Sequence, residues 1–269
     1  RFGCNAFDFG AERVAQAVRH SLAQHLGMGC GEGQRPLDVC FCHDVEFAEE
    51  LDQIVEETLP ALRELQEEGL IRRVGISGYP IPVLRYIWER APVDYIISYC
   101  HLNLCNDTLL DWIHEIRDVR AGVRDASSYG GIGEPKNKDV CFINASPLHM
   151  GLLVPKDQPV ASWHPAPAEV KEACAQAAQY CDEAGVSLPR LALKHALRLA
   201  RGSDGVVVST LVGFSNAQEV EEAVQAWQEV VQGVGELEEE PHLQKIQEIL
   251  SSVKDVEWPS GNEHPQLQK

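Results

Sequence analysis

The sequence is short of basic residues and contains no long hydrophobic run. Its 23 lysines and arginines compare with 41 aspartates and glutamates, and the formal net charge is −18. A nucleic-acid or anionic-membrane partner requires a basic surface, so this imbalance argues against both. No apolar run approaches the ~20 residues of a membrane span, and the first residues lack the pattern of a secretory signal. We therefore expect a small-molecule ligand, with no nucleic acid and no membrane as partners.

Several chemical signatures are also missing. The sequence has no Gly-x-Gly-x-x-Gly run, no P-loop and no nucleophile elbow. Its nine cysteines are unevenly spaced, which predicts reduced thiols and a cytoplasmic protein. Cys40 and Cys42 beside His43, and Cys100 and Cys105 near His101, invite a zinc hypothesis, which elemental analysis would test. Strand alternation points Cys40 and Cys42 away from His43, so we expect no metal site.

What the sequence does contain is an alternation of strand and helix patterns. Apolar runs typical of buried parallel strands occur at residues 38–43, 72–77, 93–100, 140–146 and 205–210. Amphipathic helical patterns lie between them, the clearest over 170–181 and 220–231. This alternation predicts parallel βαβ units, in either a doubly wound sheet or a barrel.

Capping residues and loops set the expected boundaries. Thr58, with Pro60 in the first turn, is expected to cap a helix that ends before Gly69, and Ser187 and Asn216 are expected to start two later helices. Residues 120–138 have no apolar period and are expected to form a long loop or insertion. We predict a main domain over 1–232 and an acidic tail over 233–269, with a helix through Leu243 and Leu250.

Ligands of parallel α/β folds bind at the carboxyl ends of the strands. The polar residues at those ends are His43 and Asp44, Ser77 and Tyr79, Ser98 and His101, Ser146, and Ser215 and Asn216. His43 shares a strand face with Val39 and Phe41, where an imidazole can exchange a proton or bind a carbonyl oxygen. The other interpretation of His43 is a buried, hydrogen-bonded structural histidine.

The loop from Gly213 to Asn216 precedes a helix, so it could place free backbone amides against an anion. An ordinary connecting loop with a glycine would have the same sequence. No lysine or arginine lies near this loop, so a 2′-phosphate would find no basic partner. If a nicotinamide nucleotide binds here, we therefore expect NAD, with NADP less favoured.

Taken together, the strand-end motifs resemble those of the aldo-keto reductases, in particular the branch that oxidises aldoses such as L-galactose. The resemblance rests on His43 to Phe47, Val74 to Pro80, Ser98 to His101, Ile143 to Leu152, and Leu211 to Gly213 with Glu221 and Glu222. It implies a (β/α)8 TIM barrel, with the first strands missing from this chain. It also implies hydride transfer between a nicotinamide and a carbonyl or alcohol, without a Rossmann domain.

The resemblance assigns roles residue by residue. His43 corresponds to the active-site histidine, and Asp44, Tyr79 and His101 are candidate substrate contacts. Ser77 and Ser98 correspond to carboxamide-binding positions, and Ser146, Leu148 and Gly151 to pyrophosphate-binding positions. Gly213, Ser215, Asn216, Glu219 and Glu222 flank the adenosine end. Ala223 stands where the family often has an asparagine.

The family's catalytic Asp, Tyr and Lys precede the region that matches Arg1 and Phe2. We therefore expect a chain truncated at its N-terminus, with little or no turnover by itself. For the intact protein the resemblance implies a dehydrogenase of carbohydrate metabolism and ascorbate biosynthesis, which oxidises a sugar to its lactone, and we take a cytoplasmic monomer as the default. The alternative is an inactive nucleotide-binding barrel that serves as a regulatory or interaction subunit.

Overall fold

The computed structural model describes residues 7–24, 36–123, 139–155, 157–158 and 160–268. The chain divides into two compact units. Unit 1 comprises residues 1–97, 119–141 and 260–269, and unit 2 comprises residues 98–118 and 142–259. Most of the predicted insertion at 120–138 lies outside the described residues.

Unit 1 contains β1 (Cys40–Cys42), β2 (Val74–Gly78) and the first residues of β3 (Tyr95–Tyr99). β1 and β2 are parallel, with Phe41 opposite Gly75 and Cys42 opposite Ile76. A Cβ atom on Gly75 would lie 2.4 Å from the Phe41 ring, so a larger residue would displace that ring. Cys42 and Ile76 are buried on the opposite face. The register thus follows the alternation that the sequence predicts.

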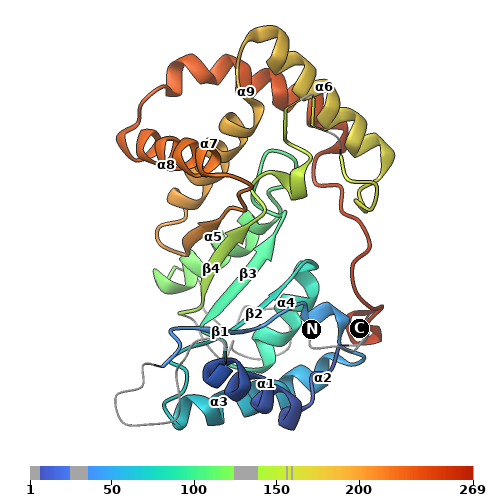
Figure 1. Cartoon of the computed structure of the whole chain (residues 1–269), viewed down its shortest axis with the longest axis vertical. Coiled ribbons are helices and arrows are strands. Elements are labelled where there is room, and N and C mark those ends of the chain that lie inside the picture. The colour runs from blue at the N-terminus through green and yellow to red at the C-terminus, as the bar shows by residue number, and fades with distance from the viewer. Residues whose placement is uncertain (1–6, 25–35, 124–138, 156, 159, 269) are drawn as a thin grey trace. The chain divides into compact units, whose positions relative to one another are not determined.

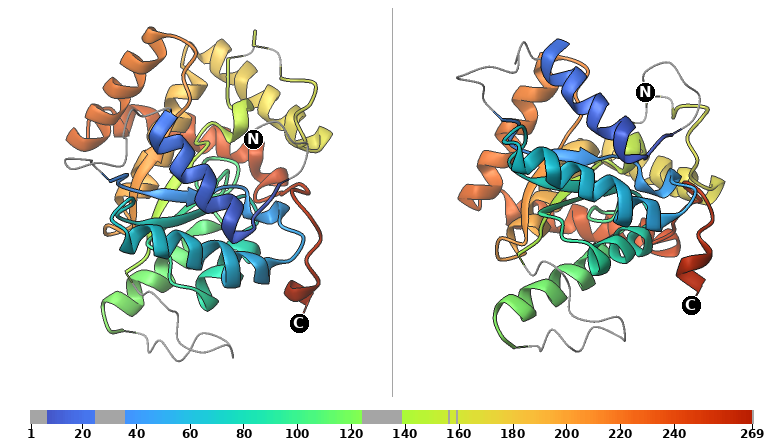
Figure 2. Two further views of the ribbon diagram at one scale, coloured as in Figure 1. Left: turned by 60° about the horizontal axis from the view of Figure 1, so that its bottom comes forward. Right: turned by 90° about the horizontal axis from the view of Figure 1, so that it is seen from below.

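The helices of unit 1 cover its strands. They are α1 (Ala11–Gln24), α2 (Leu51–Gln53), α3 (Leu59–Glu67) and α4 (Ile81–Arg90), with the π-helical turn η2 (Ile54–Thr58) and the 3-10 turns η1 (Val45–Phe47) and η6 (Pro265–Gln268). α1 packs beside α3, as both views of Figure 2 show. α4 buries Leu84, Ile87 and Trp88, which fixes its apolar face against β2.

The prediction that Thr58 caps a helix is wrong. Thr58 is itself helical, with φ −65° and ψ −53°, and its side chain caps no amide. The π-helical turn η2 runs without a break into α3, so the amides near Leu59 have partners in the preceding turn. The Thr58 hydroxyl instead donates to the carbonyl oxygen of Phe9, which ties the segment before α1 to α3.

Unit 2 contains the end of β3, then β4 (Cys141–Ala145) and β5 (Val207–Leu211). β4 and β5 are parallel, with a register shift between Phe142 and Ile143. The helices labelled in Figure 1 are α5 (Leu109–Arg120), α6 (Ala168–Ala184), α7 (Leu188–Arg201), α8 (Ala217–Gln232) and α9 (Glu236–Leu250), with the 3-10 turns η4 (His149–Gly151) and η5 (Ser251–Val253). α6 packs against α9, and α7 against β5 and α8.

Two of the predicted caps in unit 2 are confirmed. The Ser187 side chain accepts a hydrogen bond from the Arg190 amide, and Asn216 accepts one from the Glu219 amide. The amphipathic pattern over 220–231 predicts a helix that the structure has, but Val220, Val224, Trp227 and Val231 are all exposed on it. α8 buries Ala226 and Val230 instead. Periodicity revealed the helix but not the face that packs on α7.

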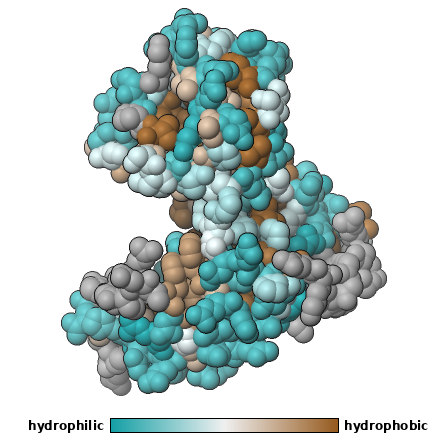
Figure 3. All heavy atoms as spheres, turned by 90° about the vertical axis from the view of Figure 1, so that its right-hand side faces the viewer, coloured by the Kyte–Doolittle hydropathy of each residue, from teal (hydrophilic) through white to brown (hydrophobic). Residues whose placement is uncertain are grey.

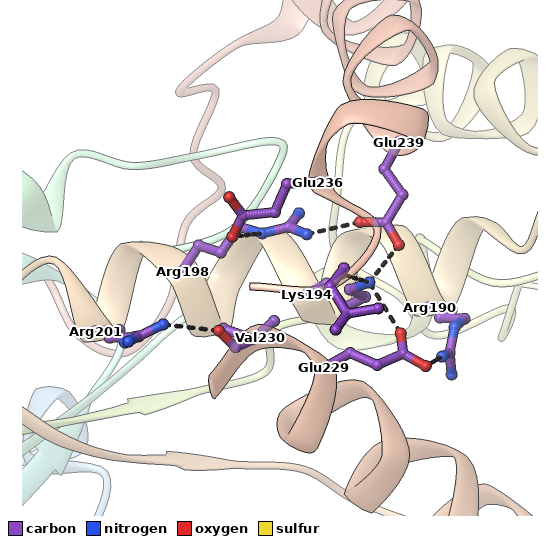
Figure 4. A network of polar contacts seen from close by, with 9 residues as sticks. Arg190, Lys194, Arg198, Arg201, Glu229, Val230, Glu236 and Glu239 are labelled. Atoms are coloured by element: carbon purple, nitrogen blue, oxygen red, sulfur yellow. Dashed lines mark hydrogen bonds and ion pairs between the residues drawn. The ribbon is translucent and has the colours of Figure 1, made fainter. Parts of the chain in front are cut away.

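Charged side chains lock three helices of unit 2 together, as Figure 4 shows. Lys194 of α7 is fully buried, and its Nζ lies 3.0 Å from Glu229 of α8 and also contacts Glu239 of α9. Arg190 pairs with Glu229 at 2.5 Å, and Arg198 with Glu239 at 2.7 Å. Both carboxylates therefore have two cationic partners, which offsets the cost of burying Lys194.

The strand order favours a barrel over a doubly wound sheet. The order is β1-β2-β3 in unit 1 and β3-β4-β5 in unit 2, so neighbours follow the chain in each. In a doubly wound sheet, the order of the strands would reverse at a switch point.

Among the described helices, none has both the length and the apolar character that crossing a bilayer requires. Hydrophilic side chains predominate on the face in Figure 3.

Candidate active site

His43 follows β1 and is exposed over 71% of its side chain. Its Nδ1 lies 2.8 Å from the Asp44 carboxylate. This hydrogen bond raises the pKa of His43, against the opposing effect of partial burial. Asp44 itself has φ 58°, a left-handed conformation that turns the chain sharply after the strand. Because Asp44 is hydrogen-bonded to Nδ1, Nε2 is the nitrogen that can hydrogen-bond a ligand.

Ser77 and Tyr79 end β2 in a buried position. Ser77 is 2% exposed, and its Oγ has no hydrogen-bond partner among the described residues. Such a buried hydroxyl is costly unless a ligand or water satisfies it, so it fits a carboxamide well. Tyr79 is 1% exposed, and its amide donates to the buried Glu46 carboxylate at 3.0 Å. Its side chain therefore lies in the core of unit 1.

In unit 2, Ser98 and His101 are both fully buried. Ser98 alternates with the half-buried Tyr99, so the two residues lie on opposite faces of β3. The Ser98 Oγ lies 3.0 Å from His101 Nδ1, and His101 Nε2 lies 3.2 Å from the Glu257 carboxylate. The structure thus places His101 between a serine and a glutamate.

The segment after β4 has an unusual backbone. Ser146, His149 and Met150 have φ values of 56°, 52° and 56°, and Gly151 has φ 87°. Left-handed conformations are unfavourable for residues with a Cβ atom, so this turn must be held by its surroundings. Amides of Gly151 and Leu153 both donate to the Leu148 carbonyl, at 3.0 and 3.1 Å. Ser146 and Leu148 are half-buried and Gly151 is exposed.

The start of α8 is exposed and acidic. Asn216 Oδ1 accepts from the Glu219 amide at 3.0 Å, while Glu219 Oε2 accepts from the Ser215 amide at 2.7 Å. This arrangement resembles a capping box, except that Glu219 reaches the amide of the residue before the cap. A Cβ atom on Gly213 would meet nothing within 4 Å, so the backbone there is open to a ligand. Glu222 lies exposed on the next turn, paired with Gln218 at 2.8 Å.

Metal binding finds no support in the described part of the chain, where no three His, Cys, Asp or Glu residues come together as a metal site. Burial raises the pKa of Cys40 to about 11 and that of Cys42 to about 12, so both stay protonated. Sequence reasoning missed Glu46, His149, Glu257 and Trp258, because their partners lie far away along the chain.

Polar residues at the ends of parallel strands, on a sheet whose strands follow chain order, define a barrel-type enzyme of small molecules. The Aldo/keto reductase family matches residues 33–233. The chain is 38% identical to L-galactose dehydrogenase of Arabidopsis thaliana over 262 residues, which cover 95% of this chain and 69% of that protein. It is 33% identical to D-arabinose 1-dehydrogenase of Saccharomyces cerevisiae over 280 residues, covering 99% and 73%. The chain belongs to the aldo/keto reductase family.

Solved structures agree on the fold. The holo form of an aldo-keto reductase from Bacillus halodurans matches with a TM-score of 0.58 and 21% identity, over 89% of this chain and 68% of that one. A glycerol dehydrogenase from Gluconobacter oxydans matches with a TM-score of 0.55 and 17% identity, over 95% and 69%. The predicted aldo-keto reductase barrel type is therefore confirmed, and the protein is homologous to sugar dehydrogenases.

Proposed function

We propose that this aldo-keto reductase uses NAD to oxidise carbon 1 of an aldose, such as L-galactose, to the lactone. Two relatives that act on sugars, at 38% and 33% identity, support this substrate class. The observation that carries the proposal is the buried Ser77 hydroxyl, which lacks a partner among the described residues at the end of β2. A carboxamide would satisfy it.

The residues of the two units divide the work. In unit 1, His43 Nε2 is placed to hydrogen-bond a sugar oxygen, with Asp44 orienting the ring through Nδ1. In unit 2, the turn from Ser146 to Gly151 is the proposed pyrophosphate contact. Ser98 remains a proposed carboxamide contact, and Asp44, Tyr79 and His101 remain proposed substrate contacts. When bound, the nicotinamide supplies the hydride acceptor.

We propose NAD over NADP because the start of α8 is acidic. Glu219 and Glu222 can accept hydrogen bonds from ribose hydroxyls, whereas a 2′-phosphate would be repelled. Residues 202–232 contain no lysine or arginine to reverse this. Gly213, Ser215 and Asn216 complete the proposed adenosine contacts.

We test the proposal by titrating NADH and NADPH into the 269-residue chain, following nucleotide fluorescence, with and without L-galactose or D-arabinose. We expect NADH to bind at least about tenfold more tightly than NADPH, a difference of about 1.4 kcal/mol. One of the sugars should tighten the binding of NAD, measured by its displacement of NADH, and glycerol should not. Absence of nucleotide binding would overturn the proposal. NADH binding without any sugar effect would favour a nucleotide-binding regulatory subunit.

For the protein's cellular role, we propose that it acts as a monomer in the cytoplasm and supplies lactone to ascorbate biosynthesis. The substrate named in the 38% identical relative supports this role.

A further inference from the structure

The segment Lys254–Trp258, which follows η5, contacts two strand-end loops of unit 2. Its first two residues hold the loop after β3. Lys254 Nζ lies 2.9 Å from the Asp107 carboxylate, and the Asp107 amide donates to Asp255 Oδ1 at 3.0 Å. The Asp255 amide donates to the Cys105 carbonyl at 2.8 Å. The segment is therefore joined to this loop by main-chain and side-chain bonds together.

Glu257 reaches the buried end of β3. Its carboxylate lies 3.2 Å from His101 Nε2, which is an ion-pair distance without hydrogen-bond geometry. On the other side of the ring, His101 Nδ1 lies 3.0 Å from the Ser98 Oγ. Glu257 and Ser98 thus contact the two nitrogens of the His101 ring, and these contacts restrict its orientation.

Trp258 packs against the turn after β4. Its ring contacts His149 edge-on, with the ring centroids 5.1 Å apart and an interplanar angle of 71°. It contacts His164 in the same way, at 5.5 Å and 70°. Trp258 is 5% exposed and His149 is 1% exposed. Neither ring nitrogen of His149 has a hydrogen-bond partner among the described residues. The edge-to-face contact with Trp258 is therefore a packing contact that holds the His149 ring in place.

His149 belongs to the strained turn. It is one of three non-glycine residues there with left-handed backbones, the others being Ser146 and Met150. Such conformations persist only where packing enforces them. The contact with Trp258 supplies this packing at the centre of the turn.

We propose that Glu257 and Trp258 are positioning residues for nucleotide binding, which hold the ends of β3 and β4 in the conformation that receives the cofactor. This inference rests on the proposed function, because the Ser146 to Gly151 turn is the proposed pyrophosphate contact. Neither residue is assigned a contact with cofactor or substrate. They act through His101 and His149.

Four variants of the 269-residue chain test the roles of these residues: Glu257→Ala, Trp258→Ala, Glu257→Gln and Trp258→Phe. We expect each alanine variant to bind NADH at least about tenfold more weakly, since small misplacements of a site have large effects. Glu257→Gln keeps an acceptor for His101, and Trp258→Phe keeps an aromatic ring. Both should stay within about threefold of the unsubstituted chain.

Matched controls are available in the same unit. Glu238 and Trp227 are exposed, so Glu238→Ala and Trp227→Ala remove the same side chains without touching the strand ends. We expect both controls to bind NADH within about twofold of the unsubstituted chain. Equal weakening in the controls and the alanine variants would overturn the inference, as would alanine variants that bind normally.

Amide hydrogen exchange without nucleotide separates this inference from the proposed function. In Trp258→Ala, we expect faster exchange in residues 146–153, and in Glu257→Ala, faster exchange in residues 98–105, with other elements unchanged. Unchanged exchange in these two segments would overturn the positioning role of Glu257 and Trp258, whatever the binding result. If the unsubstituted chain binds no NADH, the proposed function fails and so does the positioning role. Faster exchange would then assign only a structural role to the segment.

Discussion

At the strand ends of unit 1, His43 exposes 71% of its side chain and the Ser77 hydroxyl lacks a partner among the described residues. At the strand ends of unit 2, by contrast, Ser98 and His101 are fully buried and bonded to one another. Unit 1 therefore presents side-chain groups that can bind a ligand. The strand ends of unit 2 are instead held by internal contacts, and the start of its helix α8 is acidic. We propose that most cofactor contacts lie in unit 2, and that unit 1 adds the carboxamide contact of Ser77 and the sugar contact of His43.

The largest expected effect concerns the bracing of unit 2. Replacing Lys194 by Met leaves Glu229 and Glu239 with only arginine partners in a cluster whose lysine is fully buried and whose other members are partly buried (Figure 4). We expect a loss of about 3 kcal/mol in the free energy of unfolding, measured by urea denaturation. The exposed Lys245, paired with Glu248, provides the control Lys245→Met, with an expected loss below about 1 kcal/mol. Equal effects would contradict a special role for the buried cluster.

The second prediction uses the opposite titration of histidines in the two units. Burial lowers the pKa of His149 to about 3 and that of His195 to about 4, both in unit 2. The unfolded chain binds a proton at each site near pH 6.5, so stability is lost as pH falls below that value. Between about pH 7 and about pH 5, we expect each histidine to cost about 2 kcal/mol.

Unfolding by urea at both pH values checks this, and His149→Phe should remove about half of the loss. The pKa of His43 in unit 1 is raised instead. Its contribution is present below the unfolded pKa and disappears as pH rises through the folded one, and its exposure keeps that contribution small. An unchanged acid sensitivity in His149→Phe would contradict the burial of a neutral ring.

The third prediction asks whether unit 1 contacts the nicotinamide end of the cofactor. Ser77→Ala removes the buried hydroxyl, and we expect NADH affinity to fall by about 1 kcal/mol, or roughly fivefold. ADP-ribose, which lacks the nicotinamide, should bind equally well to both proteins. The exposed Ser252→Ala serves as the control. A loss of ADP-ribose affinity in Ser77→Ala would point to a structural defect instead.

The smallest expected effect concerns the start of α8. Asn216→Ala removes the acceptor for the Glu219 amide and should cost about 1 kcal/mol in stability. Asn216→Asp keeps an acceptor and should restore most of it. Thermal unfolding followed by circular dichroism can resolve the two variants. If Asn216→Ala has full stability, the Glu219 side chain alone closes the helix end.

Local patterns revealed much of this fold. The five strands lie within or next to the predicted apolar runs, because buried parallel strands need apolar residues on both faces. The caps at Ser187 and Asn216 depend only on neighbouring residues. Thr58 misled because a π-helical turn continues into α3. Periodicity predicted the helix α8, but it does not say which face of a helix other elements cover.

The candidate site was less accessible to sequence reasoning. Strand-end positions could be named because chain order places them, so His43 and Ser77 were found. Whether a side chain is buried, as Ser98 and Tyr79 are, depends on partners from other elements. The pairing of His101 with Glu257, and of His149 with Trp258, joins residues far apart in the chain. Only the folded structure brings these pairs together.

Hydrogen exchange in the presence and absence of NAD tests the division between the units most directly. We predict slower exchange on NAD binding in residues 146–151 and 213–222 of unit 2, with a smaller change near Ser77. Sugar should add protection near His43. Protection confined to unit 1, with no change in those two segments of unit 2, would contradict the proposed cofactor contacts in unit 2.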